Sequence, residues 1–155
     1  TRYAYPYLRL AELYLSYAEA DFEYNGSLSG KSLEYINRVR RRCGLPDFED
    51  SWALAGGIPS GQKLRKVLHQ ERSIEFLFEG RRFHDLRRWK EAFEVMNKQP
   101  RSWNRDGKTA EEFYRVIEAN QGGRKRIFES PKSYWMAVPM SEINKNPNLV
   151  QNPGY

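Results

Sequence analysis

Residues 127–155 constrain the fold of this chain more than any other segment. They contain four prolines, each of which lacks a backbone donor and restricts the residue before it. A long helix cannot run through them, and the Asn-Pro and Pro-Gly pairs near the end favour turns. The segment nevertheless carries apolar side chains at Ile127, Phe128, Tyr134, Trp135, Met136, Val138, Leu149 and Val150. Because disordered tails are poor in aromatic residues, we predict an irregular tail docked onto a helical body rather than a solvated terminus.

The N-terminal part is predicted to form two paired helices. The first is expected over about residues 5–24, where one apolar stripe recurs every three or four positions: Leu8, Ala11, Leu15, Ala18 and Phe22. A second stripe indicates packing on another side: Tyr7, Leu10, Tyr14 and Tyr17. Asn25-Gly26 is a stop signal. The second helix is expected over about residues 32–43, with an inner face of Leu33, Ile36, Val39 and Cys43.

The remaining residues are predicted to hold a second helix pair and a long loop region. Residues 47–60 read as a loop. The second pair is expected as one helix over about residues 61–78 and another over about residues 81–98, with Gly80 marking a break between them. Thr109 and Glu112 fit a capping box, which predicts a short helix at about residues 109–118. The predicted fold is mostly α and has four parts: a helix pair at 5–43, a helix pair at 61–98, a loop region at 99–126 and the docked tail at 127–155.

Residues 70–89 mix charged and aromatic side chains more densely than any other segment. Buried charges are costly unless they are paired, so we predict that Glu71, Glu75, Asp85 and the arginines form a bonded network. An active site built on Glu75, Asp85 and His84 is the alternative. Glycosidase carboxylates must flank a sugar across a cleft, and packed helices rarely leave that room.

The sequence offers no motif for metal binding or covalent catalysis. His69 and His84 are the only histidines, and neither has a second ligand one helical turn away. Cys43 is the only cysteine, which excludes an internal disulfide and any multi-cysteine metal site. No phosphate-binding loop, dinucleotide-binding glycine motif or G-x-S-x-G elbow occurs. We expect no cofactor, no metal site and no catalytic residue.

The chain is basic, with 26 Lys and Arg against 20 Asp and Glu. The positive residues cluster at 38–42 and at 124–126. Solvated helix faces are the simplest explanation of such clusters. Nucleic-acid binding normally needs a basic stripe on a recognisable reader motif, and none is present, so we expect no nucleic-acid partner. An acidic glycan would use the same charge.

The four tryptophans are the best candidates for ligand contact. Aromatic rings offer a large rigid surface on which the C–H face of a sugar can stack, while amides and carboxylates take the hydroxyls. Trp103 and Trp52 are expected in polar loops, where binding residues concentrate. Asn104, Arg105 and Asp106 follow Trp103 and would supply hydroxyl partners. We therefore predict Trp103, Asn104 and Trp52 as ligand-binding residues, and we expect Trp89 and Trp135 in the core.

Four blocks of this sequence occur together and in order in a known family. They are YPYLRLAELYLSYAEA at 5–20, NRVRRRCGLP at 37–46, QERSIEFLFEGRRFHDLRRWK at 70–90 and WMAVPMSEINKNPNLVQNPGY at 135–155. The chain thereby resembles the RagB/SusD family of surface glycan- and nutrient-binding lipoproteins. The resemblance implies a tetratricopeptide-like helical scaffold, and it implies that this chain is the C-terminal portion of a larger SusD-like protein.

The same resemblance implies a function. It is the non-catalytic binding of an oligo- or polysaccharide at the outer surface of the bacterial outer membrane, for delivery to a SusC-like TonB-dependent transporter. Membrane association would depend on an N-terminal lipid that this chain does not contain. A peptide or another nutrient as ligand, and a scaffold for protein interaction only, are the alternatives that remain open.

Overall fold

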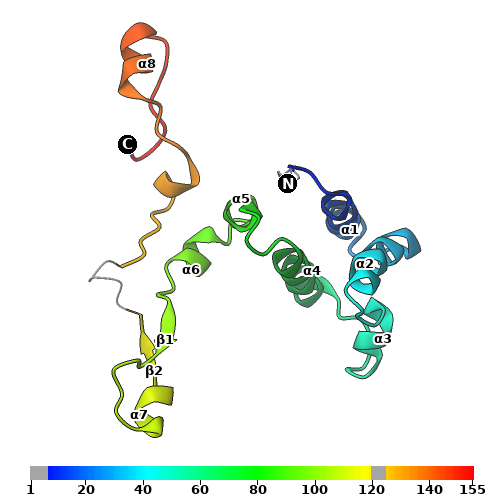
Figure 1. The fold of residues 1–155 in the computed structure, drawn as a ribbon. Helices are drawn as coiled ribbons and strands as arrows, with labels where there is room; N and C mark the ends of the chain where they lie inside the picture. The colour runs from blue at the N-terminus through cyan, green and yellow to red at the C-terminus, as the bar shows by residue number, and fades with distance from the viewer. Residues whose placement is uncertain (1–6, 120–124) are drawn as a thin grey trace, which may run out of the picture. The chain divides into compact units, whose positions relative to one another are not determined.

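The computed structural model describes residues 7–119 and 125–155, and these residues are mostly helical, as the sequence predicted (Figure 1). The chain divides into two compact units, Thr1–Arg82 and Phe83–Tyr155. Each unit has its own hydrophobic core.

The first unit is built from four helices: α1 (Leu10–Asn25), α2 (Gly30–Arg42), α3 (Phe48–Ala53) and α4 (Gly61–Glu75). Helix α1 packs against both α2 and α4, and α2 also contacts α3 (Figure 1). The predicted stripe on α1 is confirmed for Ala11, Leu15, Ala18 and Phe22, which are all buried. They join Ile36, Val39, Phe48, Leu64, Leu68 and Phe76 in the core of this unit.

The turn between α1 and α2 is fixed by backbone geometry and by one carboxylate. Gly26 ends α1 in the left-handed region with φ 72°, where a glycine is favoured, and its N–H donates to the carbonyl of Phe22. Asp21 accepts hydrogen bonds from the Ser32 hydroxyl and from the backbone N–H of Ser29, at 2.8 Å. These bonds, with that of Ser32 the largest cause, hold the pKa of Asp21 well below its ordinary value.

The first unit differs from the sequence prediction in three places. Helix α1 begins at Leu10 rather than near residue 5, which lies outside the described residues, and Leu8 is exposed and not helical. Cys43 is exposed because it follows the last residue of α2 and does not belong to its inner face. The predicted loop at 47–60 contains helix α3, because Phe48 is fully buried and its N–H donates to Asn37 Oδ1 at 2.7 Å.

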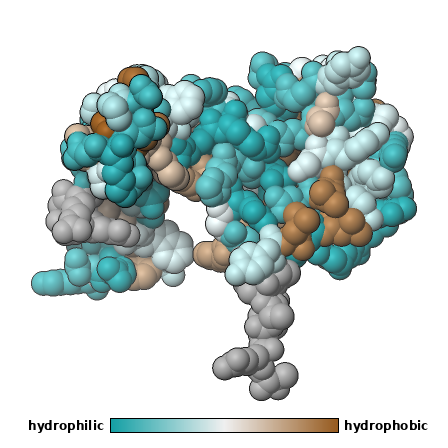
Figure 2. All heavy atoms as spheres, turned by 90° about the horizontal axis from the view of Figure 1, so that it is seen from above, coloured by the Kyte–Doolittle hydropathy of each residue, from teal (hydrophilic) through white to brown (hydrophobic). Residues whose placement is uncertain are grey.

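The second predicted stripe on α1 is only partly covered. Tyr14 is half-buried and stacks on Tyr35, with 4.6 Å between the ring centroids. Tyr7, Leu10 and Tyr17 are exposed. Figure 2 shows a mostly hydrophilic surface on which hydrophobic residues gather in a few small areas. Among the residues that the structure describes, no helix is long and apolar enough to cross a bilayer.

The second unit contains shorter elements. In chain order they are the end of α5 (Arg81–Arg88), α6 (Ala92–Met96), β1 (Arg101–Trp103), α7 (Ala110–Tyr114), β2 (Val116–Glu118), the 3-10 helix η1 (Lys132–Tyr134) and α8 (Met140–Lys145). The predicted break at Gly80 is confirmed, with φ 74°. The predicted continuous helix at 81–98 is wrong, because Lys90 adopts φ 62° and separates α5 from α6.

The tail meets α5 and α6 through its first residues. Phe128 is 5% exposed and forms the core of this unit with Leu86 and Ala92, and Trp89 packs against them as expected. Tyr134 is half-buried in the same cluster, and its hydroxyl donates to the carbonyl of Lys90 at 3.0 Å.

The end of the tail closes mainly on itself. The Gln151 side chain accepts from the N–H of Val138 at 2.8 Å and donates to its carbonyl at 2.9 Å. The Tyr155 hydroxyl donates to the carbonyl of Trp135 at 3.3 Å. The expectation that Trp135 is a core residue is wrong, because this residue is 50% exposed. Ile127, Met136 and Val150 are exposed as well.

Candidate functional site

A two-stranded hairpin in the second unit carries the predicted Trp103. Strands β1 and β2 pair antiparallel, with Trp103 opposite Val116 and Arg101 opposite Glu118. Opposite residues share one face of a sheet, so these four side chains project from the same side of the hairpin. The expectation that Trp103 lies in a loop is therefore wrong, because it is the last residue of a strand.

Trp103 is held on one side and open on the other. Its ring meets Tyr114 edge-on with 5.2 Å between centroids, and the ring of Phe113 lies at 5.9 Å. Phe113 and Tyr114 also contact each other edge-on at 5.2 Å, so the three rings form one cluster. The tryptophan nevertheless remains 54% exposed. An aromatic surface fixed before ligand arrives loses less conformational freedom on binding.

Trp103 lines a hollow of about 740 Å³, within the usual range for ligand pockets. Its other lining residues are Ser102, Arg105, Asp106, Ile117, Glu118 and Ala119. Across residues 7–119 and 125–155, the side chains of Arg105, Asp106 and Glu118 make no hydrogen bond or ion pair. A positively charged donor, Arg105, and two negatively charged acceptors, Asp106 and Glu118, are therefore available. The hollow can therefore stack an apolar face and bind hydroxyls beside it.

Asn104 follows Trp103 but does not line the hollow. It is half-buried, its N–H donates to the carbonyl of Arg115 at 3.1 Å, and its carbonyl accepts from Gly107 at 3.1 Å. Gly107 packs so tightly on α7 that an added Cβ would lie 2.5 Å from the backbone nitrogen of Phe113. This turn holds the loop that carries Arg105 and Asp106.

The capping of α7 fixes the aromatic cluster behind Trp103. Thr109 accepts from the N–H of Glu112 at 3.2 Å, as the capping box predicted. The Glu112 carboxylate accepts from the N–H of Lys108 at 2.8 Å, one residue before the position that a standard box uses. Helix α7 has only five residues, so this cap sets the start of the helix and thereby the positions of Phe113 and Tyr114.

Trp52, the third predicted ligand residue, lies in the first unit. The expectation that it lies in a loop is wrong as well. It belongs to α3, it is half-buried, and it packs against the first core beside Phe48, with 6.3 Å between ring centroids. Lys63 Nζ lies 5.6 Å from its ring centroid. Trp52 borders a separate, smaller hollow of about 300 Å³.

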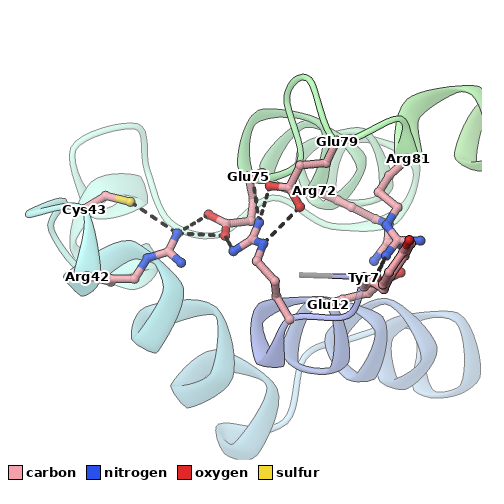
Figure 3. Close-up of polar contacts among 9 residues, drawn as sticks. Tyr7, Glu12, Arg42, Cys43, Arg72, Glu75, Glu79 and Arg81 are labelled. Atoms are coloured by element: carbon pink, nitrogen blue, oxygen red, sulfur yellow. Dashed lines mark hydrogen bonds and ion pairs between the residues drawn. The ribbon is translucent and has the colours of Figure 1, made fainter. Parts of the chain in front are cut away.

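The predicted charge network is present, and Figure 3 shows its part around α1 and α4. Glu75 accepts from Arg9 and from Arg42, each at 2.7 Å, and Arg9 also donates to Glu79. The hydrogen bonds that Arg9 donates to Glu79 and Glu75 raise the pKa of its guanidinium above the ordinary value. Glu12 pairs with Arg72 and Arg81 on the neighbouring side of α1.

The arginines of α2 are paired in the same way. Arg38 bonds Glu34 at 3.0 Å, Arg40 bonds Glu71, and Arg41 bonds Asp47 at 2.7 Å. Neighbouring arginines keep the pKa of Glu34 and of Asp47 below their ordinary values. This basic cluster therefore faces carboxylates of its own unit. In the second cluster, Arg124 lies outside the described residues.

Both carboxylates of the alternative active site are bound by arginines. Both oxygens of Glu75 accept from Arg42 at 2.7 Å, and Arg9 takes one of them as well. Asp85 is buried and accepts from Arg88 at 2.9 Å. His84 is exposed beside the ring of Phe83. These carboxylates are engaged in the scaffold. Among the described residues, no group of histidine, cysteine and carboxylate side chains could hold a metal ion.

Sequence reasoning missed the residues that complete the hollow at Trp103. Ile117 and Glu118 lie on β2, and Tyr114 supports the ring from α7. The alternation in Arg101–Trp103 and Val116–Glu118 is the only signal, and three residues are too few to distinguish a strand from a loop.

The sequence profile of the SusD family matches residues 1–155. The chain is 31% identical over 156 residues to the starch-binding protein SusD of Bacteroides thetaiotaomicron, covering 97% of this chain and 21% of that protein. It is 30% identical over 151 residues to SusD-like protein P25 of Formosa agariphila, covering 95% and 24%. The chain thus spans about a quarter or less of the length of these relatives.

Solved structures of similar fold also match this chain. BT4246 matches with a TM-score of 0.79 and 29% identity, covering 96% of this chain and 23% of that one. A SusD-like carbohydrate-binding protein of Bacteroides fragilis matches with a TM-score of 0.68 and 30% identity, covering 94% and 28%. The fold and the sequence therefore point to one family.

Proposed function

Because this chain belongs to the SusD family, we propose that it takes part in binding an oligo- or polysaccharide without cleaving it. The observation that carries the proposal is the half-exposed ring of Trp103, fixed by Phe113 and Tyr114 at the edge of a polar hollow. Two of the similar proteins are themselves described as binding starch and carbohydrate.

The proposed binding uses stacking and hydroxyl contacts. The exposed face of Trp103 would take the C–H face of a sugar ring, where aromatic surface contributes most of the affinity. Asp106 and Glu118 would accept hydroxyl protons, and Arg105 would donate. Asn104, which does not line the hollow, contributes to the turn that carries these groups, and the direct ligand contact expected of it from the sequence stays a prediction.

The chain is proposed to act as part of a larger surface protein. In this proposal the full-length protein is held at the outer face of the outer membrane by an N-terminal lipid. It captures a glycan and passes it to a SusC-like TonB-dependent transporter. Purification of the full-length protein from membranes tests this step. Co-purification of a TonB-dependent transporter is the expected result, and recovery of the protein from the periplasm without one contradicts it.

Affinity electrophoresis tests the binding proposal. The chain is run through native gels that contain neutral or acidic polysaccharides, beside Trp103→Ala and Trp135→Ala. Both tryptophans belong to the second unit and are about half exposed, so Trp135→Ala is a matched control. We expect at least one polysaccharide to retard the wild type and the Trp135 variant, but not Trp103→Ala. Equal retardation of all three chains, or of none, contradicts the proposal; in the second case peptides become the ligand class to test.

A further inference from the structure

The smaller hollow, in the first unit, has its own combination of apolar and polar walls. It measures about 300 Å³ and lies between α3 and α4, with Arg40 of α2 at one side. Its apolar lining comes from Trp52, Ala55, Val67 and Ile74. Its size is at the lower end of the range for ligand pockets, which suits a single small ring rather than a chain of sugars.

The polar wall is organised by one arginine. Arg40 donates to Glu71 Oε1, to Ser51 Oγ at 2.7 Å and to the carbonyl of Pro46 at 2.9 Å. The side chains of Arg40 and Glu71 are only 11% and 21% exposed. Arg40 therefore uses its donors to fix the Glu71 carboxylate, and its charge is already compensated.

Three polar groups at the hollow are left for a ligand. Within the described residues, Glu71 Oε2, the Gln70 amide and the Trp52 indole N–H take part in no hydrogen bond. A carboxylate oxygen accepts hydroxyl protons, and an amide both donates and accepts. Burial raises the pKa of the Glu71 carboxyl, even though Arg40 opposes the change.

The aromatic wall is held in place before any ligand arrives. Trp52 packs on the first core, next to the buried ring of Phe48. It cannot turn away without losing those contacts, so its remaining surface is a fixed platform. A ring-shaped ligand can lie on this platform and reach Glu71 and Gln70 with its edge.

We propose that this hollow binds one uncharged pyranose residue, stacked on Trp52 with its hydroxyls bound by Glu71 and Gln70. An anionic sugar is disfavoured at the polar edge of the hollow, because the open oxygen of Glu71 is negative and the charge of Arg40 is already paired. Lys63, whose Nζ lies 5.6 Å from the Trp52 ring centroid, does not line the hollow. The proposal rests on the proposed sugar-binding function, but it uses residues of the first unit only, so it can fail while the Trp103 site stands.

Saturation-transfer NMR with small glycosides tests this site. The probes are the methyl pyranosides of glucose, galactose, mannose and xylose, with glucuronic acid as the anionic comparison. Ala55→Leu fills the hollow without removing Trp52 from the core, and Gln70→Ala removes one free amide. Gln62→Ala is the matched control, because Gln62 lies on the same helix and does not line the hollow. Thermal unfolding of each variant checks that it remains folded.

We expect transfer to at least one neutral glycoside. Ala55→Leu should weaken that binding at least about tenfold, which corresponds to 1.4 kcal/mol. Gln70→Ala should weaken it less, and Gln62→Ala and Trp103→Ala should leave it unchanged. The proposal is overturned if no neutral glycoside receives transfer, if Ala55→Leu has no effect, or if glucuronic acid binds more tightly. The proposal is also overturned if only Trp103→Ala abolishes saturation transfer to the glycoside, and that result supports the Trp103 site.

Discussion

Replacing Asn97 by alanine should release the start of the tail from α6. The side chain of Asn97 accepts from the N–H of Phe128 at 2.7 Å and donates to its carbonyl at 3.0 Å. It also donates to the carbonyl of Phe93 at 2.9 Å. Gln99 repeats the first two bonds on Arg126, at 3.0 Å each. Two side-chain amides therefore bind alternate residues of the extended tail, as a neighbouring strand would.

The magnitude follows from the bonds that the substitution removes. Asn97→Ala deletes three hydrogen bonds, and each contributes about 1 kcal/mol net, so we expect a loss of about 2–3 kcal/mol. The Phe128 backbone loses both of its partners on Asn97. Asn148→Ala is the matched control, because Asn148 is an exposed tail asparagine whose side chain makes no hydrogen bond among the described residues. We expect it to change the free energy of unfolding by less than about 0.5 kcal/mol.

Two measurements check this prediction. Urea unfolding gives the change in free energy, and amide hydrogen exchange at Phe128 reports local release of the tail. We expect exchange there to accelerate at least about tenfold in Asn97→Ala, because 1.4 kcal/mol shifts an opening equilibrium by that factor. Unchanged exchange at Phe128, or equal effects of Asn97→Ala and Asn148→Ala, would show that Asn97 does not hold the tail.

Three further predictions concern the scaffold. Folding lowers the pKa of Asp21, so its contribution to stability is present above its unfolded pKa of about 3.9 and is lost as pH falls through the folded value. In urea unfolding at several pH values, the free energy of unfolding of the wild type should exceed that of Asp21→Asn at pH 7, and the difference should shrink below about pH 4. Gly107→Ala should cost about 1–3 kcal/mol in thermal unfolding, because the new Cβ meets the Phe113 backbone; an unchanged melting temperature would contradict the close packing. Glu75→Ala should lower the free energy of unfolding in urea by about 2–3 kcal/mol. This loss is smaller than for a fully buried ion pair, because Arg9 keeps its pair with Glu79. A loss no larger than that of a surface ion pair would contradict the network.

Sequence patterns predicted the elements that local periodicity determines. The stripe from Ala11 to Phe22 repeats with helical spacing, and Gly26 and Gly80 supply the left-handed turns that end or break helices. The break at Lys90 was missed, because a lysine with φ 62° has no local signal. Helix α3 was missed because it depends on the burial of Phe48 against residues that are distant in the sequence.

The candidate site was predictable only in part. Trp103 and its polar neighbours were identified from residue type, but the ring cluster with Tyr114 requires a hairpin of two three-residue strands. Trp135 was assigned to the core because it lies in the tail that was predicted to dock, whereas the end of the tail closes on its own backbone and leaves this residue half exposed. Exposure of a single aromatic ring is decided by packing, which residue type alone does not show.

Chemical-shift titration of the tryptophan indole groups shows whether Trp103 is the residue that contacts the glycan. The chain labelled with 15N is titrated with oligosaccharides cut from a polysaccharide that retards it in the gel, and each indole signal is assigned with a Trp→Phe variant. We expect a saturable shift of the Trp103 indole signal, while the signal of Trp135, which is about as exposed, stays in place. A saturable titration in which the Trp103 signal does not move would show that the glycan binds elsewhere, and it would contradict a binding site at Trp103.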